Sequence, residues 1–254
     1  MPNHWTRPEL LAALNLYHQT PFGKQHSTHP PILRLAERIG RSPGAVAMKL
    51  SNFTSLDPEE QARGISGLSG ASNADRAIWE EFAGHFEMLA DESEAALESF
   101  DIWNDETRAP DPPEEIENST AVVKVRRRQQ FFRKIVLSSY QNRCAISQLA
   151  IKELLVASHI KPWSIDPQNR LNPRNGLSLA ATYDKAFDRG FIGFNESLEL
   201  NLAPRIKALA ADSGQYVEVE SVFERFEGNP LVLPEKNLPD PEFLAWHFKN
   251  VFRN

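Results

Sequence analysis

Apolar residues recur at helical spacing through residues 1–55 and predict three helices there. Thr6 can cap the start of the first helix, and the segment PPILRLAERIG, which ends at Gly40, is expected to form the second. Ser42-Pro43 is a typical start for the third, because serine caps a helix and proline fits its first turn. The short turn GRSP between the second and third helices predicts a helix-turn-helix arrangement.

The third of these helices has an apolar face and a polar face. Val46, Leu50 and Phe53 share the apolar face and are expected to point inward. Four polar residues are expected to lie outside or on the flank, where they could meet phosphates or base edges of DNA: Arg41, Ser42, Lys49 and Asn52. The alternative is a three-helix packing module that does not touch DNA.

The middle of the chain changes composition several times. Residues 57–75 are rich in glycine and serine and predict a loop. Asp75 can cap one long helix over residues 76–100, and the prolines and acids of residues 101–120 then predict an extended linker. The segment KVRRRQQFFRKIVLSSYQNR that follows predicts a basic amphipathic helix.

The carboxyl-terminal half mixes strand and helix patterns. A short apolar strand ends at Ser158-His159-Ile160, and a polar loop with prolines leads to Arg174-Asn175-Gly176. A helical segment follows and carries Asp184 and Asp188, which lie on one helix face because they are four residues apart. Beyond it, FIGFNESLELNL predicts a hairpin, residues 203–212 a helix, GQYVEVE a strand and PEFLAWHFKNVF a closing helix.

The net charge of −6 conceals a strong segregation of charge along the chain. Residues 91–118 hold eleven acids against Arg108, whereas residues 121–143 hold seven lysines and arginines and no acid. Residues 1–55 also carry a small basic excess. The basic segment after the linker is therefore expected to contact the DNA backbone through Arg126, Arg127, Arg128, Arg133 and Lys134. The alternative is that it forms an ordinary solvated helix face.

The single cysteine excludes an internal disulfide framework and a four-cysteine zinc site. The opening MPNHWTRPEL lacks a signal-peptide pattern, and no apolar run approaches membrane-spanning length. We therefore expect a cytoplasmic protein with no membrane partner.

The strand-end histidine, the asparagine beside a turn and the paired carboxylates together indicate metal-assisted hydrolysis. An imidazole can take a proton near neutral pH, and carboxylates suit a hard cation such as Mg²⁺ or Mn²⁺. Each residue taken alone has an ordinary structural explanation. A histidine after an apolar strand is often structural, two acids on a helix are often solvated, and Asn-Gly is often only a turn.

The phrases ASHIKPW and NGLSLAATYDKAFDRG in this sequence resemble the HNH, or ββα-metal, endonucleases, over roughly residues 127–202. The resemblance implies that His159 is the general base that deprotonates the attacking water. It implies that Asn175 fixes the turn that holds the base in position. It also implies that Asp184, nine residues after the asparagine, and Asp188 bind a divalent metal ion. Many relatives have a carboxylate or histidine just before the base, where this chain has Ser158.

The amino-terminal segment also resembles a module found ahead of HNH domains, through phrases such as GRSPGAVAMKLSNF. We therefore expect an α+β protein with an all-helical, helix-turn-helix-like domain over residues 1–100, a linker over 101–120 and a ββα-metal nuclease domain over 121–254. The expected activity is metal-dependent cleavage of double-stranded DNA, in restriction or defence, with modified DNA as a further possibility. A duplex cut would favour a homodimer. The alternatives are a DNA-binding protein with an inactive HNH domain and a nuclease for structured RNA.

Overall fold

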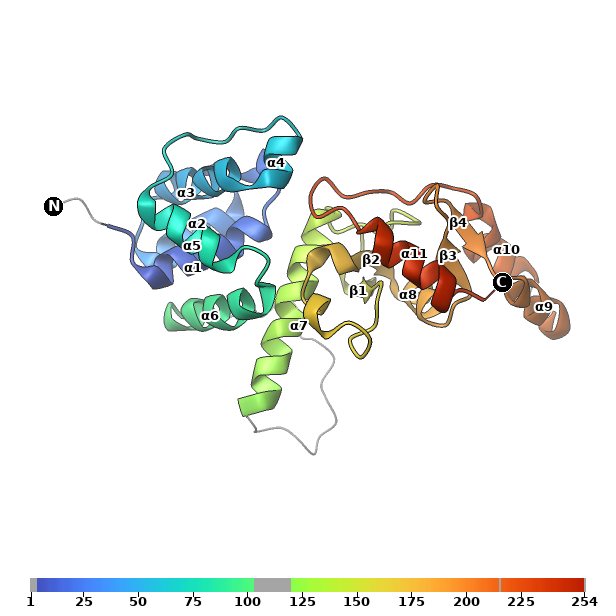
Figure 1. Cartoon of the computed structure of the whole chain (residues 1–254). Helices are drawn as coiled ribbons and strands as arrows, with labels where there is room; N and C mark the ends of the chain where they lie inside the picture. The colour runs from blue at the N-terminus through green and yellow to red at the C-terminus, as the bar shows by residue number, and fades with distance from the viewer. Residues whose placement is uncertain (1–3, 103–119, 215, 254) are drawn as a thin grey trace. The chain divides into compact units, whose positions relative to one another are not determined.

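The computed structural model describes residues 4–102, 120–214 and 216–253 (Figure 1). Its contacts divide the chain into two compact units, Met1–Ser138 and Ser139–Asn254. Nearly all of the expected linker, and Gln215 of the expected strand, lie outside the described residues. The basic helix expected to open the nuclease domain groups with the first unit up to Ser138.

The first unit is helical, as predicted. Thr6 precedes α1 and its backbone N–H donates to the Glu9 carboxylate at 2.7 Å, while the Ser42 hydroxyl accepts from the backbone N–H of Ala45 at 3.2 Å at the start of α3. Gly40 ends α2 with φ of 68°, a left-handed conformation that suits glycine. The α-helices of this unit are α1 (Arg7–His18), α2 (Pro30–Ile39), α3 (Pro43–Leu56), α4 (Pro58–Ala62), α5 (Asn73–Phe82), α6 (Phe86–Ser99) and α7 (Thr120–Ser139).

The core of the first unit lies where α1 packs against α3 and α6. Leu14, Tyr17, Leu50 and Phe53 are almost fully buried there. The Tyr17 hydroxyl donates to the Asp57 carboxylate at 2.6 Å, which satisfies a polar group inside this core. The apolar face predicted for α3 is confirmed, because Val46, Leu50 and Phe53 are all fully buried.

The single long helix expected over residues 76–100 is wrong. The chain breaks between α5 and α6, and Gly84 has φ of 73° in the break. The start also differs, because Ser72 caps α5 and its backbone N–H donates to Asp75 at 3.0 Å. Asp75 therefore completes a capping box inside the first turn and does not cap the helix itself.

The second unit contains two paired strands followed by a helix, the arrangement that the ββα resemblance implies, and the residue pattern itself had predicted only the first strand and the helix. Strand β1 (Leu155–His159) pairs antiparallel with β2 (Gly176–Ala180), and α8 (Ala181–Asp188) follows directly. The pairing places His159 opposite Gly176 and Ser158 opposite Leu177. A second hairpin of β3 (Ile192–Phe194) and β4 (Leu200–Leu202) confirms the predicted turn, and the unit adds α9 (Pro204–Ser213), α10 (Tyr216–Val222) and α11 (Pro241–Asn250). The α+β fold class is confirmed.

The strand expected at GQYVEVE is wrong, because its described part forms α10. Val217 is 72% exposed, so the alternation of valine and glutamate does not mark the buried face of a strand.

Helix α11 supports the end of α8. The His247 ring stacks on Phe187 with ring centres 3.5 Å apart, and its Nε2 lies 3.1 Å from the Phe187 carbonyl oxygen. Burial lowers the pKa of His247 to about 4, so the ring is neutral at physiological pH. Gly190 just after α8 has no room for a side chain, because an added Cβ would lie 2.0 Å from the Val251 carbonyl oxygen. In the described part of the chain, the helices are too short or too polar to cross a bilayer.

Candidate active site

His159 closes β1 and is half-buried. Its Nε2 lies 2.9 Å from the Arg170 carbonyl oxygen and 2.9 Å from the indole nitrogen of Trp163. The Trp163 indole N–H can donate to Nε2 only in the tautomer that has a lone pair there. The Arg170 carbonyl oxygen can accept from Nε2 only in the tautomer that has a hydrogen there, so the two hydrogen bonds do not form at the same time. When Nε2 donates to Arg170, the lone pair of the neutral ring is on Nδ1, where it can accept a proton.

The surroundings of His159 favour the neutral ring. Burial lowers the pKa of His159 below its ordinary value, and the hydrogen bond to the Arg170 carbonyl opposes this only in part. A general base must be unprotonated before it can act. The site therefore keeps His159 in the form that a base requires at neutral pH.

Asn175 closes the loop that presents Arg170 to His159. Its side chain is fully buried, and Oδ1 accepts from the backbone N–H of Lys161 at 2.8 Å. Nδ2 donates to the carbonyl oxygens of Lys161 and Asn169, each at 3.1 Å. The asparagine thus joins the second residue after β1 to the middle of the loop. Its role in positioning His159 is a prediction that this geometry supports.

Asp184 and Asp188 come close enough on α8 to influence each other. Burial raises the pKa of Asp184, and the adjacent Ser158 hydroxyl lowers it, although that hydroxyl forms no hydrogen bond of standard geometry. Desolvation is the largest cause that raises the pKa of Asp188, and the negative charge of Asp184 is the second. The residue as a whole is nevertheless solvent-exposed. Among the described residues, neither carboxylate forms a salt bridge, although the charge of Lys185 acts on both and that of Arg189 acts on Asp188.

A divalent cation fits this pair chemically. Two carboxylates that disfavour each other's charged form are hard oxygen ligands, which Mg²⁺ and Mn²⁺ prefer. Over the residues that the structure describes, however, no group of three or more histidine, cysteine, aspartate or glutamate side chains gathers closely enough to hold a metal. Any ion at Asp184 and Asp188 would therefore complete its shell with water and phosphate oxygens.

Ser158 separates the predicted base from the predicted metal ligands. Its hydroxyl is 2% exposed and faces Asp184. Ser158, and not His159, is the residue of β1 whose side chain acts on Asp184.

The basic residues of α7 are engaged with acids of α6. Arg127 pairs with Glu98 at 2.6 Å, Arg128 pairs with Asp91 at 2.8 Å and also with Glu87, and Lys134 pairs with Glu94 at 3.3 Å. Lys124 adds a contact to Asp91 at 2.9 Å. Arg126 is half-buried, as is Arg133, whose pKa is lowered by burial. DNA contact through these predicted residues would have to compete with the α6 carboxylates.

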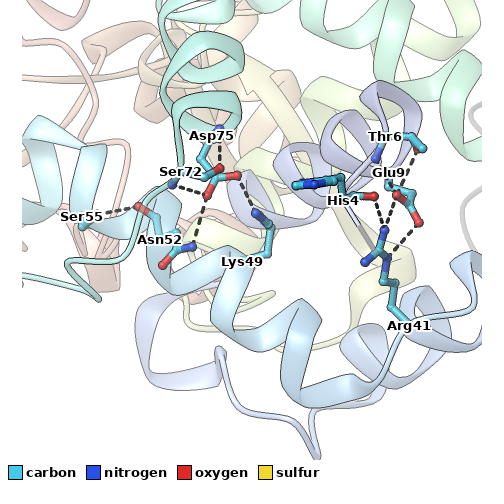
Figure 2. A network of polar contacts seen from close by, with 9 residues as sticks. All are labelled: His4, Thr6, Glu9, Arg41, Lys49, Asn52, Ser55, Ser72 and Asp75. Atoms are coloured by element: carbon cyan, nitrogen blue, oxygen red, sulfur yellow. Dashed lines mark hydrogen bonds and ion pairs between the residues drawn. The ribbon is translucent and has the colours of Figure 1, made fainter. Parts of the chain in front are cut away.

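Figure 2 shows where the candidates around α3 lie. Lys49 is 6% exposed and its Nζ lies 2.5 Å from Asp75, which also accepts from Asn52 at 3.2 Å. The outward placement expected for Lys49 and Asn52 is wrong, because Asp75 of α5 draws both into the interior. Removing Asp75 would leave the buried ammonium group of Lys49 without its partner, which should lower the free energy of unfolding by about 3–5 kcal/mol.

Arg41 is drawn into a second set of contacts in Figure 2. Its guanidinium binds the Glu9 carboxylate at 2.8 Å and the His4 carbonyl oxygen at 2.8 Å, and its side chain is 9% exposed. The expected outward position of Arg41 is therefore also wrong. Ser42 is exposed, as expected, while its hydroxyl caps α3.

Two residues next to His159 carry contacts that the sequence did not predict. Depending on the tautomer, His159 Nε2 accepts from the Trp163 indole N–H or donates to the Arg170 carbonyl oxygen, and Arg170 Nε donates to the Trp163 carbonyl oxygen at 2.9 Å. Trp163 stands four residues after His159 in the phrase HIKPW, which was the available signal. Arg170 contacts His159 through its backbone carbonyl oxygen, so its residue type gave no signal of this contact.

Comparison with known proteins agrees with this geometry. Residues 144–195, about a fifth of the chain, match the family model of the HNH endonucleases. Comparison with curated proteins finds no match. The matched segment contains β1, the Asn175 loop, β2 and α8. The match supports the HNH family for this segment, and with it the nuclease class of enzyme, which generally uses a divalent metal ion.

Proposed function

We propose that the protein is a metal-dependent endonuclease that hydrolyses phosphodiester bonds of double-stranded DNA. The observation that carries this proposal is the state of His159, a half-buried neutral imidazole at the end of β1 within the segment that matches the HNH family. The paired carboxylates of Asp184 and Asp188 support it, because they are suited to a hard cation.

In this proposal His159 takes the proton from the attacking water through Nδ1 while Nε2 donates to the Arg170 carbonyl oxygen. Asn175 holds the loop that carries this carbonyl, so it positions the base. Asp184 and Asp188 would hold the divalent ion, which when bound supplies positive charge near the cleaved phosphate and its leaving oxygen. A base of this type contributes roughly 10²–10⁴-fold to the rate.

The biological setting that we propose is restriction or defence, with modified DNA as a possible target. HNH domains usually make one cut per active site, so cleavage of both strands would favour a homodimer. Light scattering with and without duplex DNA would measure the oligomeric state.

The direct test is nicking of supercoiled plasmid, methylated and unmethylated, in Mg²⁺, in Mn²⁺ and in EDTA. We expect cleavage only with a divalent ion, and expect Asp184→Asn and Asp188→Asn to need more metal for half-maximal rate. The matched control is Glu196→Gln, which removes an exposed carboxylate from the turn after β3 and should keep the wild-type metal requirement. Metal-independent cleavage, or no effect of either aspartate, would contradict the proposal.

A DNA-binding protein with an inactive HNH domain is the second candidate. Ser158 in place of a third ligand favours it, together with the lack of a three-residue metal group among the described residues. Pure wild type that binds DNA but never nicks it would decide for this alternative. Cleavage of structured RNA in preference to duplex DNA would instead change the substrate.

A further inference from the structure

A group of basic side chains gathers at the loop between α1 and α2. Lys24 ends the short turn Phe22–Lys24, His26 follows in the loop, His29 caps α2 and Arg34 lies on that helix. The rings of His26 and His29 are 5.8 Å apart. We call these four residues the Lys24–Arg34 cluster. None of them was among the residues expected to bind DNA.

The Lys24–Arg34 cluster is exposed and is not neutralised by acids. Lys24, His26 and Arg34 are exposed, and His29 is half-buried. Ion pairs of the described residues include none of the four, in contrast with Arg127, Arg128 and Lys134 of α7. The nearest acid along α2, Glu37, forms no salt bridge with Arg34 within the described chain. No acid of the described residues therefore forms an ion pair with this surface.

The charges in the cluster act on one another. Burial lowers the pKa of His29, and the charges of His26, Lys24 and Arg34 lower it further. Helix α2 packs against α1 and α3, yet no charged group of these two helices, and no acid, is among the described charges that act on His29. An anion placed over the cluster would reverse this repulsion and favour the protonated ring.

We propose that the Lys24–Arg34 cluster is a phosphate-binding surface through which the amino-terminal unit holds the backbone of double-stranded DNA. The inference rests on the proposed function for the choice of DNA as partner. The cationic groups are spread over an exposed loop and helix, which suits an extended polyanion. Duplex DNA presents one negative charge per about 1.7 Å of helix axis, so several phosphates can meet the cluster together.

This surface has a distinctive dependence on salt and pH. Each phosphate contact contributes about 0.9 to the slope of log affinity against log salt concentration. The two contacts of Lys24 and Arg34 together should account for a slope of about 1.8. Burial and the neighbouring positive charges lower the pKa of His29, so its imidazole should add a contact only on the acid side of its ordinary pKa of 6.5. Affinity for DNA should therefore rise, and the slope should steepen, between pH 8 and pH 5.5.

The test is fluorescence anisotropy of a labelled unmodified duplex with the full chain in EDTA, where cleavage does not interfere. The first variant combines Lys24→Gln with Arg34→Gln, and the second combines His26→Gln with His29→Gln. The matched control is Arg76→Gln, an exposed arginine on α5 outside the cluster. Circular dichroism should show the wild-type melting curve for the lysine–arginine variant and for the control, and it measures what the histidine variant loses with the bond from His26 to Thr28.

We expect the lysine–arginine variant to bind on the order of tenfold more weakly at 0.15 M salt, with the shallower slope, and the control to bind within twofold of wild type. The histidine variant should match wild type at pH 8 and lose the gain in affinity at pH 5.5. Binding of the first variant within twofold of wild type, with an unchanged slope, would overturn the inference. Preference for duplex RNA would overturn the assignment to DNA.

Plasmid nicking separates this inference from the proposed function. Wild type that nicks, with cluster variants that bind normally, would refute the surface and leave the nuclease in place. Wild type that never nicks, with cluster-dependent binding, would refute the nuclease and leave the surface in place.

Discussion

Replacing Asn175 by alanine should weaken both the fold of the second unit and the active site. The side chain is fully buried and forms three hydrogen bonds, to the backbone N–H and carbonyl of Lys161 and to the carbonyl of Asn169. Each such bond has a net worth of about 0.5–1.5 kcal/mol, and a buried group left unpaired costs about 1–3 kcal/mol. We therefore expect a loss of about 2–4 kcal/mol in the free energy of unfolding.

Urea unfolding measures that loss, provided the slope with urea stays the same. Asn175→Asp should not rescue it, because a carboxylate can accept from Lys161 but cannot donate to the two carbonyls. Asn250→Ala is the matched control, an exposed asparagine with one hydrogen bond to the Trp246 carbonyl, and should change stability by less than about 0.5 kcal/mol. Nicking by Asn175→Ala, measured well below its unfolding midpoint, should fall by about 10²-fold, since a misplaced base loses alignment. Unfolding of this variant within about 0.5 kcal/mol of wild type would refute the role of Asn175 in holding the loop.

Three further outcomes are expected. A divalent cation at 100 times its Kd should stabilise wild type by about 2.7 kcal/mol in thermal or urea unfolding. Asp184→Asn should remove this gain, and the gain should fade as the pH falls through the raised pKa of Asp184, because a protonated carboxyl binds metal poorly. The rate of nicking should be lost on the acid side only below pH 6.5, because the neutral His159 is the active form and its pKa is lowered; an acid limb above that pH would contradict this. Combining Glu87→Gln with Asp91→Asn should release Arg128, strengthen DNA binding and steepen its salt dependence. Stability should change by about 1 kcal/mol per pair, because the Arg128–Asp91 pair is half-buried and still in contact with solvent.

Local signals in the sequence predicted local structure well. The cap at Ser42 and the left-handed Gly40 lie where the sequence places them, because capping depends on residues within one helical turn. The break at Gly84 was missed, since a single glycine inside an apolar helical pattern is often tolerated. The alternation of valine and glutamate at GQYVEVE was wrongly interpreted as a strand, because the pattern alone does not show whether the valines are buried.

Contacts between side chains of distant segments could not be predicted from the sequence. Lys49 and Asn52 have the residue types of an outer helix face, and their burial depends on Asp75 from another helix. The engagement of Arg127 by Glu98 likewise depends on the packing of α6 and α7. The strand end and the helix that carry His159, Asp184 and Asp188 were predicted from the sequence, but the Arg170 atom that lies 2.9 Å from His159 is a backbone carbonyl oxygen, which any residue could provide.

The most direct test of the nuclease proposal is single-turnover nicking of supercoiled DNA in Mg²⁺ or Mn²⁺ by His159→Ala. His85→Ala is the control, because His85 is an exposed histidine of the first unit. The proposal predicts a rate lower than wild type by roughly 10²–10⁴-fold for His159→Ala, with DNA affinity unchanged, and a wild-type rate for the control. Nicking by His159→Ala at the wild-type rate would show that this histidine is not the base and would contradict the proposed mechanism.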